Sequence, residues 1–144
     1  MAGTTASRQP PYKDAGGPGR GRPILVIEDE PDFRTMYERL FRRLHYDVIA
    51  ADIGTDGLRA AESVPVCLVV TDLKLPDMDG IALIRALRAR ADPPPIIVVS
   101  GLTSGETRRD ALASGATAYL TKPFSVSALT ALIQEVLSDG HEGS

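Results

Sequence analysis

Cysteine is almost missing from this chain: Cys67 is the single cysteine in 144 residues. One thiol cannot form an intramolecular disulfide, and it cannot build a metal cage of several cysteines. The apolar neighbours of Cys67 predict a small buried side chain within a strand.

Long apolar runs are also missing. No stretch approaches the roughly 20 residues that a membrane span needs, and the first residues lack the charged-then-apolar pattern of a secretory signal. The net charge of −3 is mild, which argues against non-specific nucleic-acid binding through a basic surface. We therefore expect a cytoplasmic protein that neither enters a membrane nor binds nucleic acid directly.

The chain length fits one domain. Residues 1–22 are rich in proline and glycine and show no periodicity, so they cannot bury enough apolar surface to offset their ordering entropy. We expect a disordered tail over 1–22, a folded domain over 23–138 and a short tail over 139–144.

Within 23–138, short apolar runs alternate with helical patterns. The runs expected to form strands are 24–27, 47–51, 66–70, 96–99 and 117–121. The helices that follow are expected to have Pro31 at the first position of one and Thr55, Asp79 and Ser125 as caps of three others. Five strand–helix units in alternation predict an α/β fold, a doubly wound five-stranded parallel sheet with five helices.

Polar residues stand where the predicted strands end. Glu28 and Asp29 follow the first strand, Asp72 the third, Ser100 the fourth, and Lys122 the fifth. Parallel strands bring these ends to one edge of the sheet, where ligands bind in such folds. Three carboxylates there repel one another, by around 4 kcal/mol for a pair about 4 Å apart at an effective dielectric near 20. An all-oxygen site of this kind favours Mg²⁺ over zinc or copper.

This set of groups suits phosphoryl transfer. A carboxylate attacks an incoming phosphoryl group while Mg²⁺ and a lysine neutralise its oxygens. Asp72 is the best candidate for the nucleophile because it ends the central apolar strand. Each residue alone has an ordinary structural explanation as a cap, a turn or a solvated side chain; their joint occurrence, in order, does not.

The stretches ILVIEDE, LVVTDLKLPDMDG, IIVVSG and GATAYLTKPF resemble the receiver domain of two-component response regulators, a fold of flavodoxin-like topology. The resemblance covers about residues 23–138 and implies that Asp72 is the phosphoacceptor. It also implies that Asp29 is a direct Mg²⁺ ligand, that Glu28 acts mostly through water, and that the backbone carbonyl of Lys74 is a further ligand.

The resemblance assigns the remaining positions as well. Ser100 matches the hydroxyl that bonds a phosphoryl oxygen, and Lys122 matches the lysine that pairs with another, with a cis bond to Pro123. Tyr119 matches an aromatic residue whose ring turns inward when Ser100 is drawn to the phosphate. Gly101 matches a small residue that leaves the site open to donors.

Two further positions flank the path of an attacking water in this family, and here they are Lys74 and Leu102. Neither offers a carboxylate or an amide to orient water, which predicts slow self-dephosphorylation.

The function implied is a phosphoacceptor switch rather than an enzyme. The phosphoryl group would come from a histidine kinase or a histidine phosphotransfer protein. Phosphorylation would change the surface formed by 104–114, 117–121 and 125–138, including Arg108, Arg109 and Tyr119, which a downstream protein would read. We expect a stand-alone receiver of the chemotaxis-regulator type; a fragment of a DNA-binding regulator or a hybrid histidine kinase is the alternative. Whether the phosphorylated form pairs with a second copy stays open.

Other phosphate-handling folds fit less well. A haloacid-dehalogenase-type phosphatase needs a second aspartate two residues after the nucleophile, where this chain has Lys74, and nucleotidyl-transfer folds with a paired DxD fail likewise. A flavodoxin-like cofactor binder needs a small, uncharged phosphate loop, whereas Glu28-Asp29-Glu30 would repel phosphate. No GxxxxGK[ST] loop is present.

Overall fold

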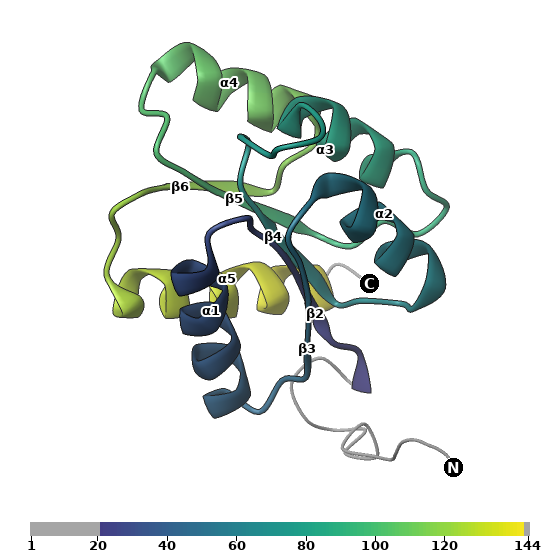
Figure 1. Cartoon of the computed structure of the whole chain (residues 1–144). Helices are drawn as coiled ribbons and strands as arrows, with labels where there is room; N and C mark the ends of the chain where they lie inside the picture. The colour runs from purple at the N-terminus through teal and green to yellow at the C-terminus, as the bar shows by residue number, and fades with distance from the viewer. Residues whose placement is uncertain (1–20, 143–144) are drawn as a thin grey trace.

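The computed structural model describes the backbone of residues 21–142 and the side chains of residues 21–138. Residues 1–20 of the expected N-terminal tail and residues 143–144 of the expected C-terminal one lie outside the described residues. Strands and helices alternate along the described chain (Figure 1). Their bounds are β2 Ile24–Ile27, α1 Pro31–Arg43, β3 Val48–Ala51, α2 Gly54–Ser63, β4 Leu68–Thr71, α3 Gly80–Arg88, β5 Ile96–Ser100, α4 Gly105–Ser114, β6 Ala118–Thr121 and α5 Val126–Glu142.

The strands form one parallel sheet in the order β3-β2-β4-β5-β6. Strand β2 pairs with β3 on one side and with β4 on the other, so the strand order reverses at β2. This arrangement confirms the predicted doubly wound, five-stranded parallel sheet with five helices. The reversal point is where the carboxyl ends of the strands leave room for a ligand.

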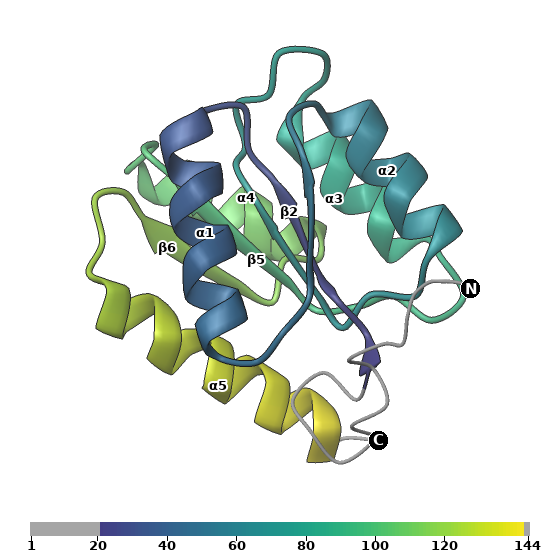
Figure 2. The ribbon, with the colours of Figure 1, turned by 60° about the horizontal axis from the view of Figure 1, so that its bottom comes forward.

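Helices cover both faces of the sheet. Helices α1 and α5 lie on one face, and α2, α3 and α4 lie on the other (Figures 1 and 2). Alternate residues of each central strand therefore enter different cores: Ile24 and Val26 pack toward α1 and α5, whereas Leu25 and Ile27 pack toward α2, α3 and α4. Burial on both faces explains why these strands are uninterrupted apolar runs in the sequence.

Most predicted helix caps are confirmed. Asp79 caps α3 by accepting a hydrogen bond from the Ile81 amide, and the Ser125 hydroxyl accepts one from the Ala128 amide in the first turn of α5. The predicted cap at Thr55 is wrong. Helix α2 begins at Gly54, so Thr55 lies within the helix, and the first amides of the helix are bound by a carboxylate from the loop between β4 and α3.

Several element boundaries differ by one or two residues from the expected ones, and the start of β4 and the end of α5 differ most. Strand β4 begins at Leu68, so Cys67 lies just before the strand and is half-buried rather than fully enclosed. Its amide donates to the carbonyl of Pro23, which extends the pairing with the segment before β2. Helix α5 continues to Glu142, past residue 138 where we expected the domain to end. No helix within residues 21–142 has the length and apolarity to cross a membrane.

Candidate functional site

The predicted site residues follow neighbouring strands of the sheet. Glu28 follows β2, Asp72 follows β4, Ser100 ends β5, and Lys122 follows β6. Because β2, β4, β5 and β6 are consecutive in the sheet, their carboxyl ends meet at one edge. Glu28, Asp72 and Ser100 are all buried there, with 1%, 8% and 0% of their surface exposed.

The ammonium group of Lys122 binds several carboxylates at once. Its Nζ lies 2.8 Å from Asp72 Oδ2, 3.0 Å from Glu28 Oε1 and 3.4 Å from Glu30 Oε1. The bond between Lys122 and Pro123 is cis, as expected from the family resemblance. One cation thus neutralises carboxylates that would otherwise repel one another.

Burial and the neighbouring charges shift the pKa values of Glu28 and Lys122 in opposite directions. Burial raises the pKa of the Glu28 carboxyl above its ordinary value, although the hydrogen bond and charge of Lys122 pull it down. Burial by itself would lower the pKa of Lys122, but its hydrogen bonds to Asp72 and Glu28 outweigh that effect and raise it. Lys122 therefore stays charged at neutral pH.

Two contacts of Lys122 were missed by the sequence analysis. Glu30 binds it from the start of α1, and the ring of Phe33 lies under it, with Nζ 4.0 Å from the ring centroid. A cation over an aromatic face is attracted by the ring quadrupole. Phe33 lies in the first turn of α1, 89 positions before Lys122, so no local sequence pattern indicates this contact.

The two oxygens of the Asp72 carboxylate have different partners. Oδ1 accepts hydrogen bonds from the amides of Leu73, at 2.6 Å, and Lys74, at 3.2 Å, whereas Oδ2 faces Lys122. The carboxylate is therefore held in one orientation by its own loop. Lys74 also pairs with Asp79 in an isolated antiparallel bridge, which closes the loop between β4 and α3.

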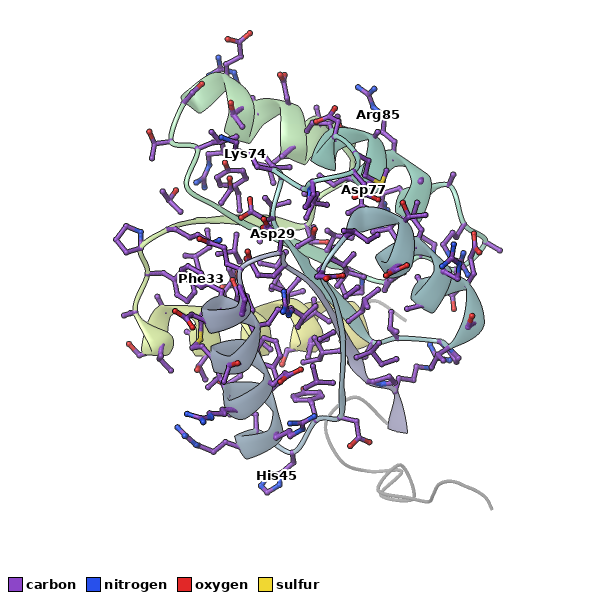
Figure 3. The ribbon with its side chains drawn as sticks, viewed as in Figure 1. Asp29, Phe33, His45, Lys74, Asp77 and Arg85 are labelled. Carbon is purple, nitrogen blue, oxygen red and sulfur yellow. The ribbon has the colours of Figure 1, made fainter. Side chains whose placement is uncertain are left out.

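Asp29 is exposed at the same edge of the sheet. Figure 3 labels it near the start of α1, together with Lys74 in the loop after β4. The backbone around Asp29 is held by Arg34, whose Nη1 donates to the carbonyls of Glu28, at 2.9 Å, and Asp29, at 3.1 Å. Arg34 is a further residue that sequence reasoning missed.

Ser100 and Tyr119 are linked through Leu102. The Ser100 hydroxyl accepts a hydrogen bond of 3.2 Å from the Leu102 amide, and the Tyr119 hydroxyl donates one of 2.7 Å to the Leu102 carbonyl. The Tyr119 ring is 7% exposed and already lies inward, with the guanidinium carbon of Arg108 5.8 Å from its centroid. Gly101 is exposed, and a Cβ there would meet no atom within 4 Å.

The donor groups at this edge suit a hard cation. Among the described side chains, those of residues 21–138, no three histidine, cysteine or acidic groups lie together in the arrangement of a metal site; the Lys122 ammonium lies against Glu28 and Asp72 instead. The groups available are carboxylate and backbone oxygens, which are the ligands that Mg²⁺ prefers. By the chemistry of its donors, the site fits magnesium.

The parallel sheet and this acidic site with one lysine define a doubly wound α/β domain with a charged site at the carboxyl edge of its strands. Residues 24–134 match the model of the response regulator receiver domain. The chain belongs to this family, whose members are signalling domains of two-component systems rather than classical enzymes.

Similar proteins share the domain in different settings. The chain is 33% identical over 123 residues to the cell cycle transcriptional regulator CtrA of Caulobacter vibrioides, covering 84% of this chain and 53% of that protein. It is 36% identical over 114 residues to the transcriptional activator protein PfeR of Pseudomonas aeruginosa, covering 79% of this chain and 37% of that one. The chain thus spans about half or less of the length of these relatives.

A solved structure resembles the whole domain. The receiver domain of the sensor histidine kinase PA1611 from Pseudomonas aeruginosa PAO1 superimposes with a TM-score of 0.74 and 30% identity, covering 81% of this chain and 98% of that one. That structure has a magnesium ion coordinated in its active site cleft.

Proposed function

We propose that this receiver domain is a phosphoacceptor switch in which Asp72 takes a phosphoryl group from a histidine kinase or a histidine phosphotransfer protein. One observation carries the proposal. Lys122 binds Asp72 Oδ2 at 2.8 Å and Glu28 Oε1 at 3.0 Å, at the point where the strand order reverses. A buried carboxylate oriented by its own loop and paired with an ammonium group suits attack on phosphorus.

In this reaction an oxygen of Asp72 forms a bond to phosphorus while the bond between phosphorus and the donor nitrogen breaks. The electron pair of that bond returns to the donor's imidazole. Lys122 would neutralise the charge of one phosphoryl oxygen, and the Ser100 hydroxyl would donate a hydrogen bond to another. Magnesium, when bound, would supply further positive charge, and the residues that would hold it are Asp29, Asp72, Glu28 (mostly through water) and the carbonyl of Lys74.

The same geometry supports a route from the site to the surface. Phosphorylation adds close to two negative charges, so we expect Ser100 to turn toward them and to release the Leu102 amide. Leu102 also holds Tyr119, which packs beside Arg108 on α4. The surface of α4, β6 and α5 is therefore the part that a downstream protein, or a second phosphorylated copy, would read.

A phosphotransfer assay tests the proposal. The chain is incubated at neutral pH with Mg²⁺ and acetyl phosphate. Mass spectrometry should then show one added phosphoryl group that hydroxylamine removes. Asp72→Asn and EDTA should each abolish it. No incorporation, even with candidate kinases, would mean that the fold serves as a constitutive binding module.

A second candidate is a receiver that works inside a longer protein. CtrA and PfeR are roughly two to three times longer than the matched part, and PA1611 is a sensor histidine kinase that contains a receiver. In that case the phosphoryl group on Asp72 would control an attached output or relay domain. An immunoblot of native cells, with an antibody against the domain, distinguishes a 144-residue product from a larger one.

A further inference from the structure

The N-terminus of helix α2 is capped by a residue from a different part of the chain. The Asp77 carboxylate accepts hydrogen bonds from the amides of Gly54, at 2.7 Å, and Thr55, at 2.9 Å, and from the Thr55 hydroxyl. The local N-cap residue, Ile53, has no side-chain bond to the helix. The first amides of a helix need an acceptor, and here the loop between β4 and α3 supplies it (Figure 3).

That loop is held at its base as well as at its tip. At the base, Asp72 Oδ1 binds two amides of the loop, and the Gly80 amide donates to the Leu73 carbonyl at 2.9 Å. A Cβ on Gly80 would lie 2.4 Å from the Leu73 Cα, so the two sides of the loop are in direct backbone contact. At the tip, the contact with α2 is equally close: a Cβ on Gly54 would lie 2.5 Å from the side chain of Met78.

Lys74 lies between these two attachments. Its amide binds Asp72, its backbone pairs with Asp79, and Asp77 follows it by three residues in the same loop. Its carbonyl is also the only proposed magnesium ligand that is not on a side chain. A backbone carbonyl can be positioned only by fixing the backbone that carries it. The hydrogen bonds between Asp77 and α2 fix the backbone of this loop at a point away from the reacting groups.

From these contacts we infer that Asp77 is a positioning residue for the phosphorylation site. By accepting hydrogen bonds from the first amides of α2, it fixes the conformation of the loop that contains the Lys74 carbonyl and binds Asp72. The inference rests on the proposed function. Asp77 does not touch the reacting atoms; it acts through Lys74. Residues that orient the ligands of a metal site typically change its affinity by about 10- to 100-fold when they are removed.

Asp77→Ala in the full chain tests this role, with Asp56→Ala as a matched control. Asp56, like Asp77, is an exposed aspartate near the start of α2, but it belongs to the first turn of the helix itself. Its carboxylate pairs with Arg59 at 3.2 Å and not with the loop. Both variants remove one negative charge beside the same helix end. Calorimetric titration with Mg²⁺ should give a dissociation constant about tenfold higher for Asp77→Ala and unchanged for Asp56→Ala.

Two milder variants cover the case in which Asp77→Ala does not fold. Thr55→Val removes only the hydroxyl bond, and Asp77→Asn keeps one acceptor oxygen, so both should weaken Mg²⁺ binding by less than Asp77→Ala does but by more than about twofold. Thr55→Ser, which keeps the hydroxyl, should match the wild type. These constants are measured well below each melting temperature, so that a loss of fold stability alone does not change them.

The outcomes separate the inference from the proposed function. If the wild type takes up a phosphoryl group with Mg²⁺ but Asp77→Ala, or Thr55→Val in its place, binds Mg²⁺ within twofold of the wild type, the positioning role is overturned and the phosphoacceptor function stands. If the wild type shows no Mg²⁺-dependent phosphorylation, the proposed function fails, and the inference fails with it.

Discussion

The hydroxyl of Tyr119 donates a hydrogen bond of 2.7 Å to the backbone carbonyl of Leu102. Leu102 also donates its amide to the Ser100 hydroxyl. One residue of the loop between β5 and α4 therefore joins the end of β5 to the middle of β6. In the proposed switch, this connection would carry a change at Ser100 to Tyr119 and the neighbouring face of α4.

Tyr119→Phe should destabilise the fold by about 1 kcal/mol, because the Leu102 carbonyl loses a partner in a mostly buried place. Tyr37 supplies the matched control. It is 1% exposed, and its hydroxyl is the one buried side-chain polar atom within the described residues that lacks a hydrogen-bond partner. Tyr37→Phe should therefore leave the free energy of unfolding in urea unchanged or raise it. Equal losses in the two variants would contradict the assigned role of the Tyr119 hydroxyl.

Lys122→Met should destabilise the fold by about 3 kcal/mol or more, because it leaves Glu28 and Asp72 without their buried cation. The effect should depend on pH. The pKa of Glu28 is raised in the folded state, so the folded chain holds this proton better than the unfolded chain does. Its contribution to stability therefore declines as pH rises from about the ordinary glutamate value upward. Without Lys122 the decline should be steeper and extend to higher pH.

Urea unfolding between pH 5 and 8 in EDTA measures this effect. Lys74→Met is the control, since Lys74 is exposed and its loss should change the free energy of unfolding by less than about 0.5 kcal/mol. Adding Glu28→Gln to Lys122→Met should restore part of the loss at neutral pH. A Lys122→Met chain as stable as the wild type at pH 8 would show that these ion pairs do not stabilise the fold.

The sequence predicted what depends on local pattern. Apolar runs such as Ile24–Ile27 gave the buried strands, since burial on both faces leaves no polar position, and Asp79 and Ser125 were identified as caps from their place before helical patterns. The convergence of Glu28 and Asp72 also followed, because parallel strands end at a common edge.

What the sequence did not predict depends on contacts between distant segments. Thr55 has the residue type of a cap, but the cap of α2 comes from Asp77, 22 residues later. In the same way, Glu30 and Phe33 contact Lys122 across more than 85 positions. Helix periodicity assigns Phe33 to the core, and nothing in its neighbourhood indicates which cation lies above its ring.

Cys67 should react slowly with thiol reagents. Burial raises the pKa of its thiol from 9.0 to about 12, and only the thiolate is the nucleophile. At pH 8 this shift lowers the thiolate fraction, so modification by a disulfide reagent should be on the order of a thousandfold slower in the native chain than in urea. As pH rises above 9, the unfolded chain loses this proton first, so stability should fall toward pH 12. A native rate equal to that in urea would show that the thiol is accessible and ionised.

The phosphorylated form should be long-lived. In the proposed mechanism, water must approach the phosphoryl group on Asp72 past the side chains two positions beyond Asp72 and two beyond Ser100. These are Lys74, which is exposed, and Leu102, which packs against the core. Neither can accept a proton from water or hold it in line for attack, so general-base assistance is missing.

We therefore expect a half-life of minutes or longer in Mg²⁺, measured by intact mass spectrometry after removal of the phosphodonor. Lys74→Asn, which introduces an amide able to orient water while leaving the backbone carbonyl in place, should shorten it several-fold. Lys74→Met is the control for loss of the charge and should not shorten it. A wild-type half-life of seconds would mean that water reaches the phosphoryl group by another path, and the roles given to Lys74 and Leu102 would then be wrong.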